Sequence, residues 1–147
     1  MPTHSETRKL PYSAQQMYDL VADVGSYPEF IPWTAAARIR SVEEQGEKTV
    51  MLADLVISFK VFRERFGSRV VLWPEDLKID TEYLDGPFRH MISNWSFRDA
   101  DGGCEVDFHV DFEFRNRLLQ GAATMFFNDA MQRIVRAFER RADELYG

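Results

Sequence analysis

The chain has 147 residues, of which 45% are hydrophobic and 29% charged, and its formal net charge at pH 7 is −6. This length fits one folded domain, residues 1–147, that buries about 70% of the surface its unfolded form exposes. The acidic balance argues against general nucleic-acid binding, DNA included, because phosphates demand a positive footprint. The single cysteine, Cys104, excludes an intrachain disulfide. No stretch approaches about 18 consecutive apolar residues, so any membrane contact would be peripheral.

A strand and a capped helix are predicted at the start of the chain. Residues 3–10 are expected to form the strand. Ser13 and Gln16 have the spacing of a capping box, in which the serine accepts a hydrogen bond from the third helical amide and the glutamine reaches back. Apolar residues at helical spacing follow to about Val24, so Gly25 is expected to end the helix.

Residues 27–33, with the sequence Tyr-Pro-Glu-Phe-Ile-Pro-Trp, form an irregular but apolar segment. Its two prolines discourage both a helix interior and a central strand. Loops normally lie in water, so this one either folds back onto the first helix or touches something apolar. In the second case it would be the mouth of a cavity, or an anchor at a membrane interface, where Trp and Tyr accumulate. The sequence leaves both alternatives open.

The rest of the chain predicts strands joined by short turns, followed by a long helix. The strand candidates are residues 36–43, 48–57, 59–72, 77–83 and 88–98. Strict alternation over 104–114 predicts a further strand, and residues 118–146 predict the helix. This order of elements, with short loops, indicates an α+β fold in which a curved antiparallel sheet grips the terminal helix.

Aromatic residues make up 14% of the chain, enough to line a wide apolar cavity. The predicted faces bring together Phe62, Phe66, Trp95, Phe97, Phe108, Phe112, Phe127 and Met131. An ordinary packed core would explain such a stripe. However, one helix covers only part of a curved sheet, and residues 118–127 are apolar nearly all round, which calls for partners on more than one side. A packed core and an apolar guest both remain open.

Glu64 has the same strand parity as Phe62 and Phe66, so a regular strand would place an acid on the apolar face. A buried acid needs a hydrogen-bonding partner, and here it could bind the polar head group of a ligand. The favoured alternative is a β-bulge that turns Glu64 outward.

The opposite face of the 104–114 strand carries a histidine among carboxylates. The residues are Glu105, Asp107, His109, Asp111 and Glu113. One face of one strand cannot converge several ligands on a single ion, so a solvated face balanced by arginines is favoured over a metal site. Motifs of a phosphate loop, a zinc protease and a nucleophile elbow are absent from the sequence. We therefore predict no catalytic residue and no metal ligand.

Five segments together resemble the coenzyme-Q-binding branch of the START lipid-transfer superfamily, a branch that also contains bacterial ribosome-association toxins. They are PYSAQQMYDLVADVGSYPEFIPW (11–33), FRERFGSRV (62–70), GPF (86–88), WSF (95–97) and the stretch from VDFHVDFEF to the end (106–147). No one segment is decisive, whereas their order and spacing are specific.

The resemblance implies a helix-grip fold, in which an antiparallel sheet wraps around the C-terminal helix with an apolar cavity between them. It also implies a non-enzymatic protein that binds ubiquinone, or a similar isoprenoid lipid, and supports respiratory electron transport without a catalytic cofactor. Within the matching segments, the expected ligand-binding residues are Phe30 and Trp33 at the mouth, Phe62, Glu64, Phe66, Trp95, Phe97, Phe108 and Phe112 on the sheet, and Phe127, Met131 and Val135 on the helix.

Two other functions stay open. One is a toxin-like regulator that binds the ribosome and blocks subunit association, through a basic patch formed by Arg133, Arg136, Arg140 and Arg141. The other is an enzyme that uses the cavity, with Glu64 as its polar group. No targeting extension precedes the matching segments, which is typical of a bacterial cytoplasmic form with peripheral contact at the inner membrane.

Overall fold

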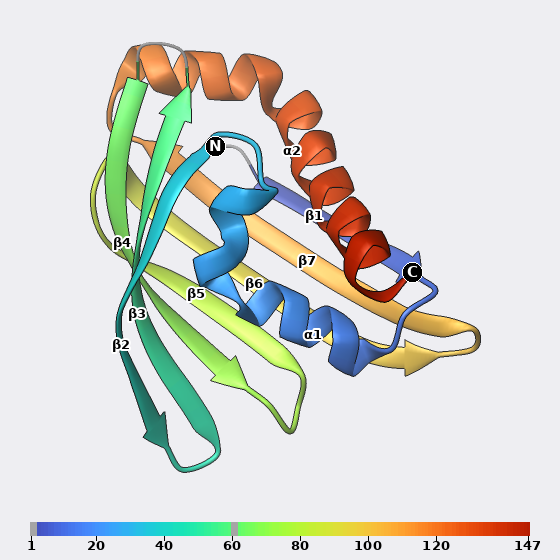
Figure 1. Cartoon of the computed structure of the whole chain (residues 1–147). Helices are drawn as coiled ribbons and strands as arrows, with labels where there is room; N and C mark the ends of the chain where they lie inside the picture. Colours follow the sequence, from blue (N-terminus) through green and yellow to red (C-terminus); the bar gives the residue numbers. More distant parts are fainter. Residues whose placement is uncertain (1–2, 60–61) are drawn as a thin grey trace.

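A computed structural model describes residues 3–59 and 62–147 (Figure 1). The elements in chain order are β1 (Thr3–Leu10), α1 (Ala14–Ala22), the 3₁₀ helix η1 (Val24–Glu29), β2 (Thr34–Gln45), β3 (Lys48–Phe59), β4 (Phe62–Trp73), β5 (Lys78–Asp85), β6 (Phe88–Ala100), β7 (Gly103–Phe114) and α2 (Arg117–Tyr146). The seven strands form one antiparallel sheet in the order β1-β7-β6-β5-β4-β3-β2. Both helices lie on the concave face of this curved sheet, which confirms the predicted α+β helix-grip fold (Figure 1).

Helix α1 begins with the predicted capping box but ends earlier than predicted. The Gln16 amide donates to Ser13 Oγ at 3.1 Å, and the Ser13 amide donates to Gln16 Oε1 at 3.0 Å. The helix ends at Ala22 because Asp23 turns the chain, accepting hydrogen bonds from the Ser26 amide (3.1 Å) and hydroxyl (2.6 Å). Gly25 therefore lies within η1 and does not end α1.

The apolar segment 27–33 folds back onto the hydrophobic core, where Tyr27 and Phe30 pack against Phe138 of α2. Its start is the end of η1, with Pro28 inside this 3₁₀ helix. The Tyr27 hydroxyl donates to the Val21 carbonyl at 2.5 Å, and burial raises the pKa of that hydroxyl far above its ordinary value. The hydrogen bond therefore fastens the segment to the end of α1.

The hydrophobic core lies between α1, the middle of the sheet and the second half of α2. Met17 and Val21 are 2% and 1% exposed. Burying a side chain of this kind contributes about 1.5–3 kcal/mol to stability. Helix α2 adds a buried stripe at helical spacing, which consists of Met131, Val135, Phe138 and Ala142. Figure 1 shows that α2 first crosses one end of the sheet and then turns to run down its concave face.

Two register shifts change which residues face the core. In β6, Phe88 pairs with Phe114 and His90 with Glu113, so Arg89 is an extra residue and Phe88 turns to the concave face, where it is 4% exposed. In β5, Tyr83 pairs with Ser68 and Asp85 pairs with Gly67, so Leu84 between them is an extra residue. Both shifts lie at the end of the sheet that the first half of α2 crosses (Figure 1).

Candidate ligand-binding site

The middle of the concave face carries a group of rings that we call the first aromatic cluster. Trp95 and Phe108 are cross-strand partners in β6 and β7, and their ring centroids lie 4.3 Å apart. Phe138 of α2 packs edge-on against Trp95 at 5.2 Å. The members of this cluster are Tyr18, Tyr27, Phe30, Trp95, Phe97, Phe108 and Phe138.

A second aromatic cluster lies under the first half of α2. Phe88 stacks on Phe114 at 4.6 Å and meets Phe66 edge-on at 5.2 Å. Phe127 of α2 contacts Phe112 of β7 at 5.6 Å. The members are Phe66, Tyr83, Phe88, Phe112, Phe114 and Phe127. Phe88 was not among the side chains predicted for the concave face. Regular alternation from Met91 along β6 would have placed Arg89 on that face instead.

A polar chain on the concave face of β1 joins this strand to α2. His4 Nε2 lies 2.7 Å from Glu6 Oε1, and Arg8 Nε donates to Glu6 Oε2 at 2.7 Å. Arg8 also donates to Gln132 Oε1 at 3.2 Å, and its Nη1 lies 3.1 Å from Glu139 Oε1. This last contact is an ion pair without hydrogen-bond alignment, since Glu139 Oε1 accepts no hydrogen bond from the described residues. Polar groups therefore form one wall of the concave face.

The charge state of Glu6 depends on its two neighbours. Burial acts to raise the pKa of Glu6, but the hydrogen bonds from His4 and Arg8 outweigh it and hold the pKa below its ordinary value of 4.5. The His4 ring also lies 6.3 Å from Phe108 and 6.0 Å from Phe127, so it stands between the two aromatic clusters.

The residues predicted to bind a ligand differ in their burial. Phe66, Phe97, Met131 and Val135 are buried, between 3% and 8% exposed. Half-buried are Phe30, Trp33, Trp95, Phe108, Phe112 and Phe127. The side chain of Phe62 lies outside the described part of the chain. The structure thus brings most of these side chains to the concave face, and their role in binding stays a prediction.

Glu64 keeps the parity of Phe66, because β3 and β4 pair without interruption from Thr49↔Leu72 to Phe59↔Phe62. The β-bulge expected there is therefore wrong. Glu64 is nevertheless exposed, since β4 extends past its pairing with β5, which begins at Gly67↔Asp85. An exposed acid does not supply the buried polar group that an enzyme in this cavity would need.

The predicted mouth residues lie between η1 and β2. Phe30 packs edge-on against Phe138 at 5.3 Å, and the Arg141 guanidinium lies 5.3 Å from the Phe30 ring centroid. Trp33 has φ 65°, a left-handed conformation that costs a bulky residue roughly 1–2 kcal/mol. Its carbonyl accepts a hydrogen bond from the Ser58 amide at 2.8 Å.

The outer face of β7 is a solvated charged surface, as predicted. Arg98 donates to both Asp107 and Glu105. The Asp107 pKa is lowered by a hydrogen bond from Thr7 and another from Arg98. No group of His, Cys, Asp or Glu side chains in residues 3–59 and 62–147 has the arrangement of a metal site.

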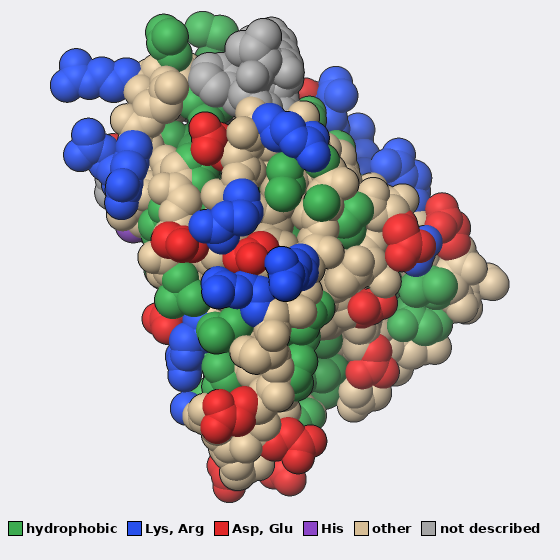
Figure 2. Space-filling view, turned by 60° about the vertical axis from the view of Figure 1, so that its left-hand side comes forward, with side chains coloured by type: hydrophobic (Ala, Val, Ile, Leu, Met, Phe, Trp, Pro, Cys, Tyr) green, Lys and Arg blue, Asp and Glu red, His purple; other side chains and the backbone are tan. Residues whose placement is uncertain are grey.

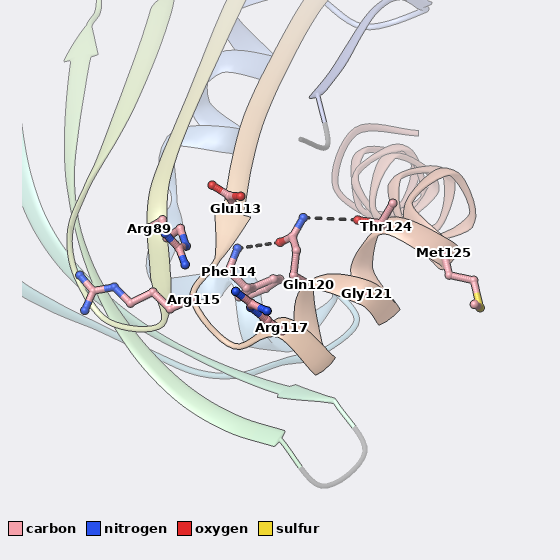
Figure 3. A pocket seen from close by; sticks show the side chains of 9 residues that line it. All are labelled: Arg89, Glu113, Phe114, Arg115, Arg117, Gln120, Gly121, Thr124 and Met125. Atoms are coloured by element: carbon pink, nitrogen blue, oxygen red, sulfur yellow. Dashed lines mark hydrogen bonds between the residues drawn. The ribbon is translucent and has the colours of Figure 1, made fainter.

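A groove of about 760 Å³ lies where β7 passes into α2 (Figure 3). Its walls are Arg89, Glu113, Phe114, Arg115, Arg117, Gln120, Gly121, Thr124 and Met125. Gln120 holds the groove in shape, since its side chain accepts from the Phe114 amide at 2.7 Å and donates to Thr124 Oγ1 at 3.3 Å. Leu118 and Met125 beside it are 79% and 76% exposed.

This region, which we call the basic end, is defined by Arg89, Arg115, Arg117, Leu118 and Met125. The first turn of α2 carries no acid, although the positive pole of a helix normally favours one. The ion pairs of the described residues involve other arginines. Figure 2 shows basic side chains projecting at the upper end and over the middle of this face, and acidic side chains gathered at its lower tip. The charged side chains are therefore unevenly distributed over the surface.

No helix in the described part of the chain is long and apolar enough to cross a membrane.

Comparison with known proteins places these features in a family. A family model described as polyketide cyclase/dehydrase and lipid transport matches residues 10–139. The ribosome association toxin RatA of Rickettsia prowazekii is 36% identical over 148 residues, which is 99% of each chain. The mitochondrial coenzyme Q-binding protein COQ10 homolog B of Xenopus laevis is 34% identical over 149 residues, covering 98% of this chain and 59% of its own length.

Solved structures share the fold over nearly the whole chain. The solution structure of an 18 kDa protein from Caulobacter crescentus is 31% identical, with a TM-score of 0.83 and coverage of 100% of this chain and 99% of the other. The Zhui aromatase/cyclase of a Streptomyces species has a TM-score of 0.79 at 18% identity, covering 97% and 93%. Proteins named for binding, for toxicity and for catalysis thus share this architecture.

The polar chain on β1 predicts a specific pH dependence for Glu6→Gln. The folded pKa of Glu6 lies below its unfolded value, so its stabilising contribution is present above about pH 4.5 and is lost as the pH falls through the folded pKa. We expect Glu6→Gln to melt several degrees below the natural protein near pH 7, and the gap to narrow below about pH 4. Thermal melts between about pH 3 and 7 test this; a gap of constant size would contradict it.

Proposed function

Because the chain belongs to the polyketide cyclase/dehydrase and lipid transport family, we propose that it is a non-enzymatic carrier of ubiquinone or a similar isoprenoid quinone. The observation that carries this proposal is the second aromatic cluster. It lies under a stretch of α2 that leaves Leu118 and Met125 exposed and Phe127 only half-buried. An isoprenoid tail placed there gains about 0.8 kcal/mol for each buried CH₂.

The two halves of α2 differ in how firmly they are held. The second half packs on α1 and the first aromatic cluster, with Phe138 6% and Ala142 0% exposed. Among the described side chains of the first half, Phe127 contacts the second aromatic cluster through Phe112 and is only half-buried. Lifting this half would open the space between β7 and α2 while the core stays intact. A coenzyme Q-binding relative at 34% identity supports a quinone as the guest.

The charged groups of the concave face favour holding a ligand over transforming one. His4, Glu6 and Arg8 are hydrogen-bonded to one another and tie β1 to α2. Groups that neutralise each other in this way are engaged in structure, while a general acid or base must be available to the substrate.

A carrier must also give up its ligand at a membrane. The basic end combines exposed apolar side chains with arginines, which is the combination that binds anionic membrane surfaces. It adjoins the second aromatic cluster, because Phe114 of that cluster lines the same groove as Arg115 and Met125. A quinone could therefore pass between bilayer and protein without crossing water. We propose that this end docks transiently on the membrane.

The quinone proposal predicts the effect of Phe127→Ala. Titration of the protein in detergent with ubiquinone carrying two isoprene units should quench tryptophan emission to saturation. The variant should raise the Kd about tenfold, because the ligand loses one aromatic contact. Leu20→Ala in α1 is the control, since Leu20 is 4% exposed in the core, away from the second aromatic cluster. It should lower the melting temperature and leave the Kd unchanged. Equal Kd values for all three proteins would contradict the proposed location.

The docking proposal predicts the behaviour of a Leu118→Glu, Met125→Glu double variant. Both side chains are exposed, so stability should change little, whereas co-sedimentation with anionic phosphatidylglycerol vesicles should fall at least about fivefold. Leu145→Glu is the matched control, because Leu145 is 51% exposed at the far end of the same helix. Raised salt should weaken binding of the natural protein. Unchanged vesicle binding in the double variant would rule out this end as the docking surface.

A regulator directed at the ribosome is the second candidate, and relatives named ribosome association toxins support it. Arg133, Arg136 and Arg140 are exposed at helical spacing along α2. Arg141 does not join them, since it contacts Glu29 at 3.3 Å and is largely covered. The predicted patch is thus reduced to three arginines.

This candidate predicts that Arg136→Glu, Arg140→Glu abolishes co-sedimentation with ribosomal subunits at moderate salt. Charge reversal turns attraction to the RNA phosphates into repulsion. The quinone titration should be unaffected, because both side chains lie on the exposed side of α2. If the natural protein bound neither ribosomal subunit, the ribosome-directed function would be contradicted and the carrier function would be the one that remains.

A further inference from the structure

One buried polar group of β5 is the hydroxyl of Tyr83. Tyr83 lies on β5 with the same parity as Ile79, which is 2% exposed in the core, so its side chain belongs to the concave face. Its hydroxyl oxygen is shielded from solvent and has no hydrogen-bond partner among the described residues. Buried hydroxyls are nearly always satisfied, so an exception calls for an explanation.

The ring of Tyr83 packs at the edge of the second aromatic cluster. The Tyr83 ring meets Phe88 edge-on at 5.4 Å, and Phe88 contacts Phe66, Phe112 and Phe114 at 4.6–6.0 Å. Phenyl rings offer no conventional acceptor, so these neighbouring rings give the hydroxyl nothing to bond. The extra residue Leu84 follows directly and shapes the backbone that presents Tyr83.

The strand next to Tyr83 carries a second hydroxyl on the same face of the sheet. Ser68 of β4 is the cross-strand partner of Tyr83, and it is 2% exposed. Cross-strand partners have Cβ atoms about 4.5–5.5 Å apart. Ser68 Oγ lies 3.5 Å from the Ala53 carbonyl oxygen, longer than an ordinary O–H···O hydrogen bond. Both side chains therefore lie on the concave face, and the described residues leave each hydroxyl with unused hydrogen-bonding capacity.

We propose that Tyr83, together with its cross-strand partner Ser68, is the head-group site of the carrier, where the tyrosine hydroxyl donates a hydrogen bond to a carbonyl oxygen of the bound ring. This inference rests on the proposed function and names the residue that orients the ligand. A quinone has the required chemistry, since its flat ring packs on phenyl rings and its carbonyl oxygens accept hydrogen bonds. An isoprenoid tail carries no acceptor, so the head would lie at Tyr83 and the tail along the rest of the second aromatic cluster.

Tyr83→Phe tests the proposal, because it removes the hydroxyl and keeps the ring. Two probes are titrated into each protein: ubiquinone with two isoprene units, and squalene, an isoprenoid hydrocarbon without oxygen. We expect the variant to raise the Kd for the quinone about tenfold and to leave the Kd for squalene within about twofold. The ligand-free variant should melt at the same temperature or higher, since no hydrogen bond is lost. Ser68→Ala should weaken quinone binding by a smaller factor.

Tyr12→Phe is the matched control. The Tyr12 hydroxyl donates to Asp143 on the exterior, so its loss should lower the melting temperature and leave both Kd values unchanged. An equal quinone Kd for the natural protein and Tyr83→Phe would overturn the head-group site and leave the carrier function standing. A lower melting temperature of ligand-free Tyr83→Phe, with unchanged affinity, would also overturn it, because the hydroxyl would then be bonded to trapped water. A natural protein that binds neither probe would overturn both proposals.

Discussion

The architecture depends on one geometric constraint: a single long helix has to cover the concave face of a seven-stranded, strongly curved sheet (Figure 1). The second half of α2 meets this constraint with help from α1, and the side chains between them reach the burial of an ordinary core. The first half of α2 is supported by no second helix in the described part of the chain. It crosses the second aromatic cluster with Phe127 half-buried and leaves Leu118 in solvent. The division between a closed core and a loosely covered end follows from this geometry, and the proposed binding site lies at that end.

For the binding of an anionic partner, the distribution of charge over the surface matters more than the net charge. A net charge of −6 argues against anionic partners in general. However, exposed acids such as Glu43, Glu44 and Glu47 gather at the β2–β3 hairpin, at the opposite end of the sheet from the start of α2 (Figure 1). At physiological ionic strength, charges farther apart than about 8 Å are largely screened from one another. A membrane or an RNA that approaches the basic end therefore experiences Arg89, Arg115 and Arg117 rather than the net charge.

Alternation and capping made much of the fold predictable from the sequence. The strict alternation of 104–114 identified the concave face of β7, and the Ser13–Gln16 pair identified the start of α1. The register shift that turns Phe88 inward was not predictable, because a bulge depends on pairing with β7 and not on the sequence of β6 alone.

Other features depend on contacts between elements far apart in the sequence. Strand β1 has no apolar alternation, so its inward polar chain becomes visible only once Arg8 is seen beside Gln132 and Glu139. The Tyr83 hydroxyl has no hydrogen-bond partner among the described residues, and this became visible only once the Tyr83 ring was seen against Phe88 of β6. The exposure of Glu64 was likewise not predictable from its own strand, because it results from where the pairing of β4 with β5 begins.

The most direct test of the carrier function is to identify what the protein holds when it is isolated from a quinone-producing cell. Native mass spectrometry of the purified protein, combined with organic extraction, measures the bound ligand and its ratio to the chain. A carrier should retain ubiquinone at close to one molecule per chain. A protein that is empty, and that takes up no added quinone in detergent, would contradict the carrier function and make the second aromatic cluster part of an ordinary core.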